Sequence, residues 1–184
     1  GHHEMATWPL SVRLTVSRSS YYKLATHSSQ QSLGCQWKIK GRGNGMKVHQ
    51  VDERYIIKIE RGELVHASLH AFCSEHEIVN ATLTGIGAVE WVRCGYFDPD
   101  VKDYRFQEYD DVFEVTSYLG NVMRKQDTIF VHAHATFSDR QNQVFGGHVD
   151  EMRVGVVLEV VLTPLSSQIE RTFDETIGLH LMDL

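Results

Sequence analysis

The sequence predicts an α+β domain in which a mainly antiparallel, multi-stranded sheet is flanked by one principal helix. After residue 45, most segments alternate apolar with polar residues and are rich in β-branched and aromatic side chains, which is typical of strands. A single segment, residues 63–73, places apolar residues near helical spacing. Many strands around one helix favour an antiparallel sheet, because each pair of parallel strands needs a long crossover connection.

The expected elements follow in chain order. Residues 54–59 alternate and form a first strand, and the helix at residues 63–73 uses Leu69 and Phe72 among its apolar positions. Residues 81–97 are expected to form two strands that join or kink at Gly85 and Gly87; the third glycine and the following helix of a dinucleotide-binding motif are absent. Further strands are expected at residues 104–109, 113–119, 129–137, 143–148, 153–163 and 170–174.

The length of 184 residues and the hydrophobic content of 42% suffice for one domain with a buried core plus an appendage. No apolar run approaches the roughly 20 residues that span a membrane. The three cysteines, Cys35, Cys73 and Cys94, are widely spaced and form no CxxC pair, so no disulfide framework is expected. These features indicate a reducing compartment, and we expect a cytoplasmic protein unless residues 6–45 direct import into an organelle.

Residues 1–45 differ in kind from residues 46–184, which we take as the domain. The first five residues, Gly-His-His-Glu-Met, resemble the remnant of a purification tag, so their histidines are excluded as ligands. Residues 6–45 contain no acid and many Ser, Thr and Gln. They could be vector-derived or upstream sequence before a start at Met46, a transit peptide, or a functional basic arm. A short run, Lys40-Gly41-Arg42-Gly43, lacks the proline of the minor-groove AT-hook.

These two parts of the chain have net charges of opposite sign. Residues 1–45 hold six Lys or Arg and one acid, whereas residues 46–184 hold twelve basic and twenty-three acidic residues, a net charge of −11. Lys and Arg that neutralise phosphates supply most of the nonspecific affinity for nucleic acids. The acidic domain is therefore expected to repel DNA, and any affinity would depend on residues 6–45.

The most informative motif is His132-Ala133-His134, followed by Gly146-Gly147-His148. His132 and His134 point to the same face if residues 129–137 are extended. If the chain turns near Gln141, His148 becomes the antiparallel partner of His134, and directly opposed residues share a face. The spacing therefore predicts that one hairpin brings three imidazoles together.

Three neutral imidazoles suit zinc first and other divalent transition metals next. A fourth coordination position would stay open, which permits catalysis without showing it. Gly146 and Gly147 would let the backbone bend and approach closely before His148, although an ordinary bulge accounts for them equally well. A lone histidine on a strand is usually structural, and only the convergence of three favours a metal site.

Four residues are candidates for a pocket or for hydrogen bonds around the histidines. They are Glu114, Tyr118, Asn121 and Asp150. Alternation over residues 113–119 predicts that Glu114, Thr116 and Tyr118 share a polar face opposite Phe113, Val115, Ser117 and Leu119, and Gly120-Asn121 is expected to make a turn. Asp150 shares the face of His148 and, like Glu114, could be a general base, an acceptor for an imidazole N–H, or a surface acid.

A second pair of histidines, His66 and His70, lies one helical turn apart within residues 63–73. This spacing can bind zinc, but Ala67 stands where the glutamate of a His-Glu-x-x-His metalloprotease motif would be. We interpret the pair as an exposed helical face.

Several sequence segments together resemble the plants and prokaryotes conserved domain, the PPC domain, over residues 51–181. The segments that carry the resemblance, in order, are Gly85-Ile86-Gly87-Ala88, Gly95-Tyr96, Phe113-Glu114, Leu119-Gly120-Asn121, His132-Ala133-His134, Gly146-Gly147-His148 and Glu159-Val160-Val161-Leu162. The resemblance implies a homotrimer, and prokaryotic members bind a metal, commonly zinc, through histidines that match His132, His134 and His148, near a subunit boundary.

Plant members of that family carry AT-hooks and act in the nucleus, so bacterial relatives are often labelled DNA-binding. Here the plant Gly-Arg-Phe-Glu-Ile-Leu run appears as Asp111-Val112-Phe113-Glu114-Val115-Thr116, without the glycine and arginine. The leading hypothesis is thus a metal-binding homotrimer of the stand-alone prokaryotic type, with unassigned biochemical activity. The alternatives are a DNA-binding or chromatin-associated regulator, and a metal-dependent enzyme that acts on a small molecule.

Overall fold

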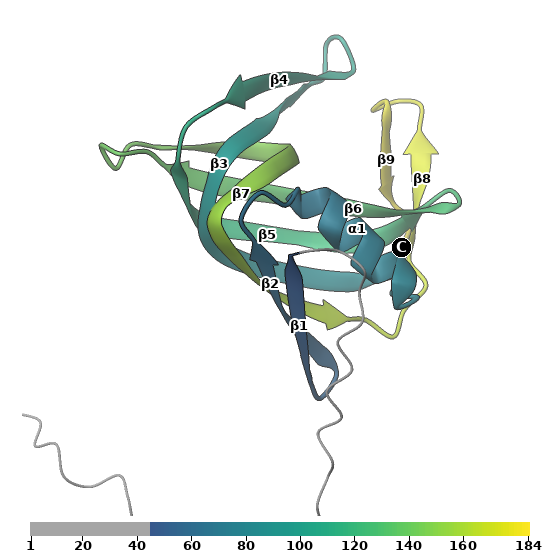
Figure 1. Ribbon diagram of the computed structural model, residues 1–184. Helices are drawn as coiled ribbons and strands as arrows, with labels where there is room; N and C mark the ends of the chain where they lie inside the picture. Colours follow the sequence, from purple (N-terminus) through teal and green to yellow (C-terminus); the bar gives the residue numbers. More distant parts are fainter. Residues whose placement is uncertain (1–44) are drawn as a thin grey trace, which may run out of the picture. The chain divides into compact units, whose positions relative to one another are not determined.

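The computed structural model describes residues 45–184, which fold into nine strands and one helix (Figure 1). The elements are β1 (Met46–Val51), β2 (Arg54–Glu60), α1 (Val65–Glu75), β3 (Ala81–Asp98), β4 (Asp103–Tyr109), β5 (Phe113–Lys125), β6 (Thr128–Ser138), β7 (Val144–Pro164), β8 (Glu170–Asp174) and β9 (Leu179–Met182). The predicted α+β class with one flanking helix is confirmed. In this part of the chain, no helix is long and apolar enough to cross a membrane.

All strands belong to one sheet, whose main order is β1-β2-β7-β3-β5-β8-β9. Strand β4 pairs with β3, while β6 pairs with both β5 and β7. Among the described pairings, only that of β5 with β8 is parallel. Because β7 pairs with β6 at its start and with β3 along most of its length, the pairings close on themselves and the sheet curls. Figure 1 shows β3 and β7 bending around one side of the molecule.

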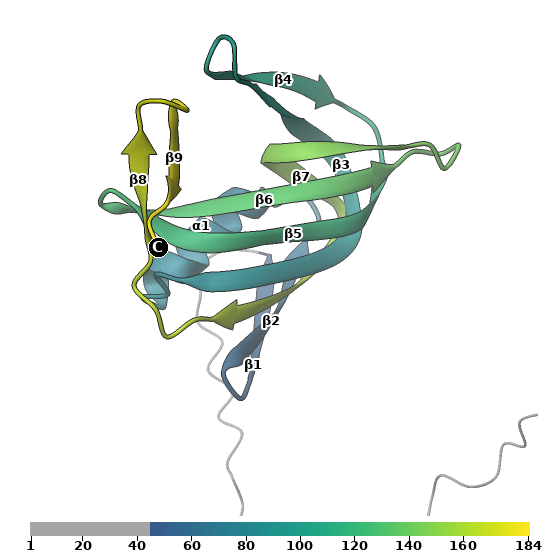
Figure 2. The same ribbon diagram turned by 180° about the vertical axis from the view of Figure 1, so that it is seen from behind.

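The core lies between α1 and the curled sheet. The helix buries Val65, Leu69, Phe72 and Cys73 on one face, and β6 contributes alternate residues to the same core. Figure 2, seen from the opposite side, shows β5 and β6 in front of α1. Each fully buried aliphatic side chain contributes about 1.5–3 kcal/mol. One face of β6 is therefore committed to the core, and its other face is left for other contacts.

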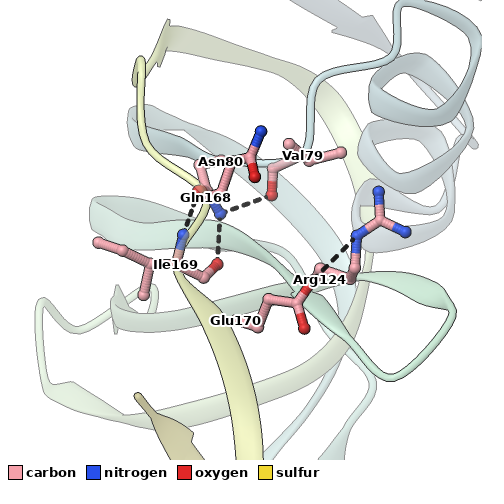
Figure 3. Close-up of a pocket in the computed structure, with 6 residues that line it drawn as sticks. All are labelled: Val79, Asn80, Arg124, Gln168, Ile169 and Glu170. Carbon is pink, nitrogen blue, oxygen red and sulfur yellow. Dashed lines mark hydrogen bonds and ion pairs between the residues drawn. The ribbon is translucent and has the colours of Figure 1, made fainter. Parts of the chain in front are cut away.

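The β8–β9 hairpin is attached to the sheet through the chain just before β8. The side chain of Asn80 donates to the carbonyl of Ile169 at 2.7 Å and accepts from the Ile169 N–H at 2.8 Å (Figure 3). Arg124 of β5 and Glu170 of β8 form an ion pair at 3.5 Å. Asn80 is 2% exposed, so these bonds are shielded from water. The hairpin therefore has a fixed position relative to β5.

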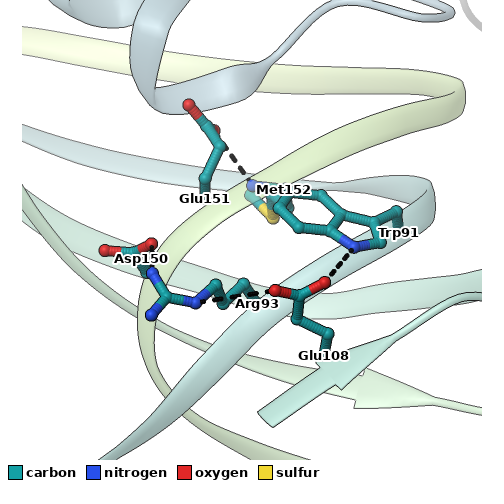
Figure 4. A network of polar contacts seen from close by, with 6 residues as sticks. All are labelled: Trp91, Arg93, Glu108, Asp150, Glu151 and Met152. Carbon is teal, nitrogen blue, oxygen red and sulfur yellow. Dashed lines mark hydrogen bonds and ion pairs between the residues drawn. The ribbon is translucent and has the colours of Figure 1, made fainter. Parts of the chain in front are cut away.

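The N-terminus of α1 is capped from a distant strand. Its N-cap residue, Leu64, makes no side-chain cap bond. Instead, the carboxylate of Glu151 accepts the backbone N–H groups of His66 at 2.8 Å and Ala67 at 3.1 Å, and in Figure 4 it points toward the helix. A carboxylate there satisfies orphan N–H groups and interacts favourably with the helix dipole. This cap joins α1 to β7 three residues after His148.

Several predicted boundaries are wrong. Residues 81–97 form one continuous strand, β3, with register shifts between Gly85 and Gly87. The two strands predicted at residues 143–148 and 153–163 are one strand, β7, which spans Val144–Pro164. The turn predicted at Gly120-Asn121 is absent, because β5 continues to Lys125. A Cβ on Gly120 would collide with the backbone of β6, so this glycine serves close packing of strands. Strands β1 and β9 were not predicted, and the interpretations of residues 1–44 lie outside the described residues.

Candidate metal centre

The β6–β7 hairpin positions the three histidines as the sequence predicts. The turn contains Gln141, and the N–H of Asn142 donates to the carbonyl of Asp139 at 3.0 Å. In the resulting register, His134 lies directly opposite His148. His132 is two residues earlier on β6, on the same face as His134. The predicted strand pairing is confirmed, and one potential ligand atom of each histidine lies within 4.8 Å of the others.

Alternation along β6 and glycines on β7 produce this geometry. Val131, Ala133, Ala135 and Phe137 are all buried, which turns the intervening histidines away from the core. On β7, a Cβ on Gly147 would lie 2.5 Å from the carbonyl oxygen of Gly95 on β3. Only glycine allows this approach, so β7 can contact β3 immediately before His148.

The three imidazoles form a compact triangle with one open side. Their ring centroids are 5.4 Å apart for His132 and His134, 5.2 Å for His132 and His148, and 5.4 Å for His134 and His148. His148 is only 8% exposed, His132 is partly buried, and His134 is exposed. An ion held by the three rings could therefore be approached from solvent beside His134.

Two hairpins enclose the buried side of this cluster. The ring of Tyr104, on β4, stacks on His148 with centroids 4.4 Å apart. On the other flank, the guanidinium of Arg171, on β8, lies 3.0 Å from Nδ1 of His132. The tips of the two hairpins touch, because Lys102 Nζ donates to the carbonyl of Glu175 at 2.9 Å. Both hairpins rise past β6 on the same side in Figures 1 and 2.

The environment favours the neutral form of two of these histidines. Burial, assisted by the positive charge of Arg171, lowers the pKa of His132 from 6.5 to about 4. Burial, assisted by the neighbouring imidazole of His134, lowers the pKa of His148 to about 4. Neutral imidazole is the form that binds metals. Nδ1 of His148 is also buried without a hydrogen-bond partner among the described residues. The donor set and this unsatisfied nitrogen fit a divalent transition metal.

Asn121 is the candidate pocket residue that the structure places nearest the histidines. It pairs with His132 across β5 and β6, and its Oδ1 accepts from Nη2 of Arg171 at 3.0 Å. Asp150 forms an ion pair with Arg93 (Figure 4), and its charge opposes the lowering of the pKa of His148. Asn121 therefore contacts Arg171, which in turn contacts His132, whereas Asp150 influences His148 through its charge.

The other two candidates, Glu114 and Tyr118, lie away from the three histidines. Glu114 is exposed and pairs with Ser138. Leu119 is the cross-strand partner of His134, and Glu114 lies five residues before it. Five residues of extended strand separate Glu114 from Leu119 by about 17 Å. The face predicted for Tyr118 is wrong, because a register shift between Val115 and Ser117 breaks the alternation. Tyr118 is fully buried, its hydroxyl has no partner among the described residues, and burial raises its pKa well above 10.0.

The two histidines of α1, His66 and His70, differ in their exposure to solvent. His70 is exposed, as predicted, and lies 3.4 Å from the hydroxyl of Thr128. His66 instead turns inward, with its ring centroid 6.0 Å from that of Tyr118. Burial lowers the pKa of His66 from 6.5 to about 4, and its Nε2 is buried without a partner among the described residues. The interpretation of an exposed helical face is therefore wrong for His66.

Sequence reasoning missed Tyr104 and Arg171. Both reach the histidines from strands that are remote in sequence, and no local motif marks either one. Their strands, at residues 104–109 and 170–174, were predicted, but which strand faces the cluster depends on the curl of the whole sheet.

Residues 46–166 match the family model of the Plants and Prokaryotes Conserved (PCC) domain. No curated protein matches the chain. Among solved structures, a metal-containing protein from Archaeoglobus fulgidus is 32% identical, with a TM-score of 0.68 over 73% of this chain and 96% of that one. A PPC protein from Pyrococcus horikoshii is 29% identical, with a TM-score of 0.68 over 77% and 96%.

A candidate DNA-binding protein from Bacteroides thetaiotaomicron is also similar in structure. It is 25% identical, with a TM-score of 0.73 over 76% of this chain and 98% of that one. The family model covers well over half of this chain, and these solved structures are covered almost completely. The resemblance seen in the sequence motifs is thereby confirmed: this chain belongs to the plants and prokaryotes conserved domain family.

Proposed function

We propose that this chain is a metal-binding protein whose site consists of His132, His134 and His148. The observation that carries the proposal is the convergence of three potential ligand atoms within 4.8 Å on one hairpin. Two of these imidazoles are kept neutral by burial. The similar protein from Archaeoglobus fulgidus is described as metal-containing, which supports the same assignment here.

Zinc is the proposed metal, because it accepts three imidazole nitrogens and retains a fourth position. When bound, such an ion supplies a Lewis acid that can hold water or another small ligand at that position. The protein's own groups orient the ligands: Tyr104 packs on His148, and the β6–β7 register holds His134 opposite His148.

Metal analysis of the full chain tests this proposal. Both His2 and His3 are changed to alanine in every sample, so that the N-terminal histidines cannot contribute. We expect one zinc per chain in this background and in the control His70→Ala, which removes an exposed helical histidine. His134→Ala should lose stoichiometric zinc. Retention of zinc by His134→Ala would contradict the assignment.

We also propose that the chain assembles as a homotrimer through one exposed apolar face. This face lies on β2, β7, β3 and β5, which are consecutive in the sheet. It exposes Ile56 by 42%, Ile86 by 58%, Leu119 by 55% and Val161 by 37%. Clusters of exposed apolar side chains on a folded sheet mark interaction surfaces. Leu119 is the cross-strand partner of His134, so the interface would border the open side of the metal centre.

Measurement of the oligomeric state tests the proposed trimer. Analytical ultracentrifugation of the full chain should give a trimer. Ile86→Asp places a charge in the apolar face and should produce monomers, whereas Val144→Asp, at an equally exposed position beside the β6–β7 turn, should not. A monomeric parent protein, or a trimeric Ile86→Asp variant, would refute the proposed interface.

A reducing, cytoplasmic compartment fits the cysteines. Cys73 and Cys94 are buried and free, and burial raises the pKa of Cys73 to about 12. Such a thiol is unreactive, so neither residue is suited to redox chemistry.

Within this proposal, the functional unit is residues 46–184, which includes the family match and the β8–β9 hairpin.

A further inference from the structure

Arg171 is a buried cation whose observed partners are all uncharged. It is 7% exposed. Its Nη1 donates to the carbonyl of His180 at 3.1 Å, while Nη2 donates to Asn121 Oδ1 at 3.0 Å and to His132 Nδ1 at 3.0 Å. Its Nε is buried and has no partner among the described residues. A buried charge without a counter-ion is costly, so this position calls for an anion.

The contact between Arg171 and His132 conflicts with metal binding. A guanidinium only donates hydrogen bonds, so Nδ1 of His132 must be the acceptor and the ring proton must be on Nε2. A metal bound at Nδ1 would take the lone pair that Arg171 uses. A metal bound at Nε2 would move the ring proton to Nδ1, which could then no longer accept. In either case, metal binding releases Arg171 from His132.

The released guanidinium is suited to a carboxylate. Nε, which is already free, and Nη2, which is freed from His132, lie along one edge of the guanidinium. This edge can donate two parallel hydrogen bonds to the two oxygens of one carboxylate. A divalent ion beside Arg171 adds further positive charge, which strengthens the attraction for an anion.

We propose that Arg171 anchors the carboxylate of a small molecule that also reaches the open position of the metal. The proposal rests on the proposed metal-binding function. Metal and carboxylate then bind cooperatively, because the metal releases the anchor and the carboxylate neutralises both cations. Asn121 and the His180 carbonyl keep Arg171 beside the cluster. Arg171 lies outside residues 46–166, so the β8–β9 hairpin adds this anchor to the matched domain.

Acetate titration of the Co²⁺-loaded full chain tests the anchor, with His2→Ala and His3→Ala as background. Co²⁺ replaces zinc so that visible absorption reports ligand exchange at the metal. Arg171→Gln should weaken acetate binding at least about tenfold, the usual effect of losing hydrogen bonds to a charged group. Arg61→Gln is the control, since Arg61 is an exposed arginine in the turn after β2 and pairs with Glu90. It should bind acetate as the parent does.

Co²⁺ affinity separates this inference from the proposed function. Arg171→Gln should bind Co²⁺ at least as tightly as the parent, because the competitor for His132 is gone. Saturating acetate should raise the Co²⁺ affinity of the parent and not that of Arg171→Gln. If the parent binds no Co²⁺, the metal-binding function fails, and the anchor fails with it. If it binds Co²⁺ but acetate has no effect, or has the same effect in Arg171→Gln, only the anchor is refuted.

Arg171→Lys covers the case in which Arg171→Gln does not fold. Lysine keeps the charge but has no planar pair of donors. Acetate should therefore bind several-fold more weakly than to the parent, with Co²⁺ still bound. Equal acetate affinity in the parent and Arg171→Lys would overturn the two-bond anchor.

Discussion

Replacement of His66 by phenylalanine should make the protein less sensitive to acid. His66 is partly exposed, but its ring lies against Tyr118 and its Nε2 is buried; desolvation lowers its pKa from 6.5 to about 4, against an opposing effect of Asp150. The unfolded chain therefore binds a proton at this position before the folded chain does. Stability is retained above pH 6.5 and is lost as the pH falls toward 4. Phenylalanine keeps a ring of similar size and cannot take up a proton.

The size of the effect follows from the two pKa values. Between pH 7.5 and pH 5, a group that titrates near 6.5 when unfolded and near 4 when folded costs about 2 kcal/mol of folding free energy. At pH 7.5 this cost is close to zero. There, loss of the unsatisfied Nε2 contributes about 1–3 kcal/mol in favour of the variant, offset by the lost contact with the backbone of Asp150.

Urea unfolding of the full chain at both pH values, with a chelator present, measures this difference. The parent should lose about 2 kcal/mol more than His66→Phe on going from pH 7.5 to pH 5. His70→Phe, one turn away and exposed, is the matched control and should behave as the parent does. If the parent and His66→Phe show the same pH dependence, then His66 binds a proton equally well in the folded and unfolded chain, and the reasoning is wrong.

Three further predictions concern the cap, the hairpin and DNA. Glu151→Ala removes the carboxylate that caps α1 and should destabilise the protein by about 1–3 kcal/mol, seen as urea unfolding at lower denaturant and faster amide exchange in α1. Gly147→Ala forces a Cβ against the carbonyl of Gly95 and should displace His148, so that zinc affinity falls at least about tenfold in a competition titration. The control Gly62→Ala strains the backbone at a φ of +87° in the turn after β2, outside the β6–β7 hairpin, and should leave zinc affinity unchanged. In a gel shift at two salt concentrations, the chain started at Met46 should not bind duplex DNA, because it is strongly acidic; tight binding would contradict the charge argument.

The hairpin was predictable because its geometry is local. Strand alternation and the position of the turn fix which residues share a face, and both can be read over residues 132–148. The register shift between Val115 and Ser117 could not be predicted in this way. It depends on how β5 fits between its neighbours, and it sends Tyr118 into the core.

Contacts across the curled sheet were beyond sequence reasoning for a different reason. Tyr104 and Arg171 are in strands with no pattern that distinguishes them from other strands. They reach His148 and His132 because β3 and β7 bend, and because pairing with β5 and the bonds of Asn80 to Ile169 hold the β8–β9 hairpin in place. The three donor residues could therefore be predicted, but the groups that contact them could not.

The metal donors and the groups that flank them come from different parts of the sheet. The three histidines come from one hairpin inside the matched family domain, where strand register holds them together. The groups on either side come from β4 and β8, whose tips meet through Lys102 and Glu175. A substitution in these flanking strands can alter what reaches the metal without moving the donors, as strand register does not depend on it. We therefore expect substitutions in the hairpin to abolish metal binding, and substitutions of Arg171 to change ligand selectivity while the metal still binds.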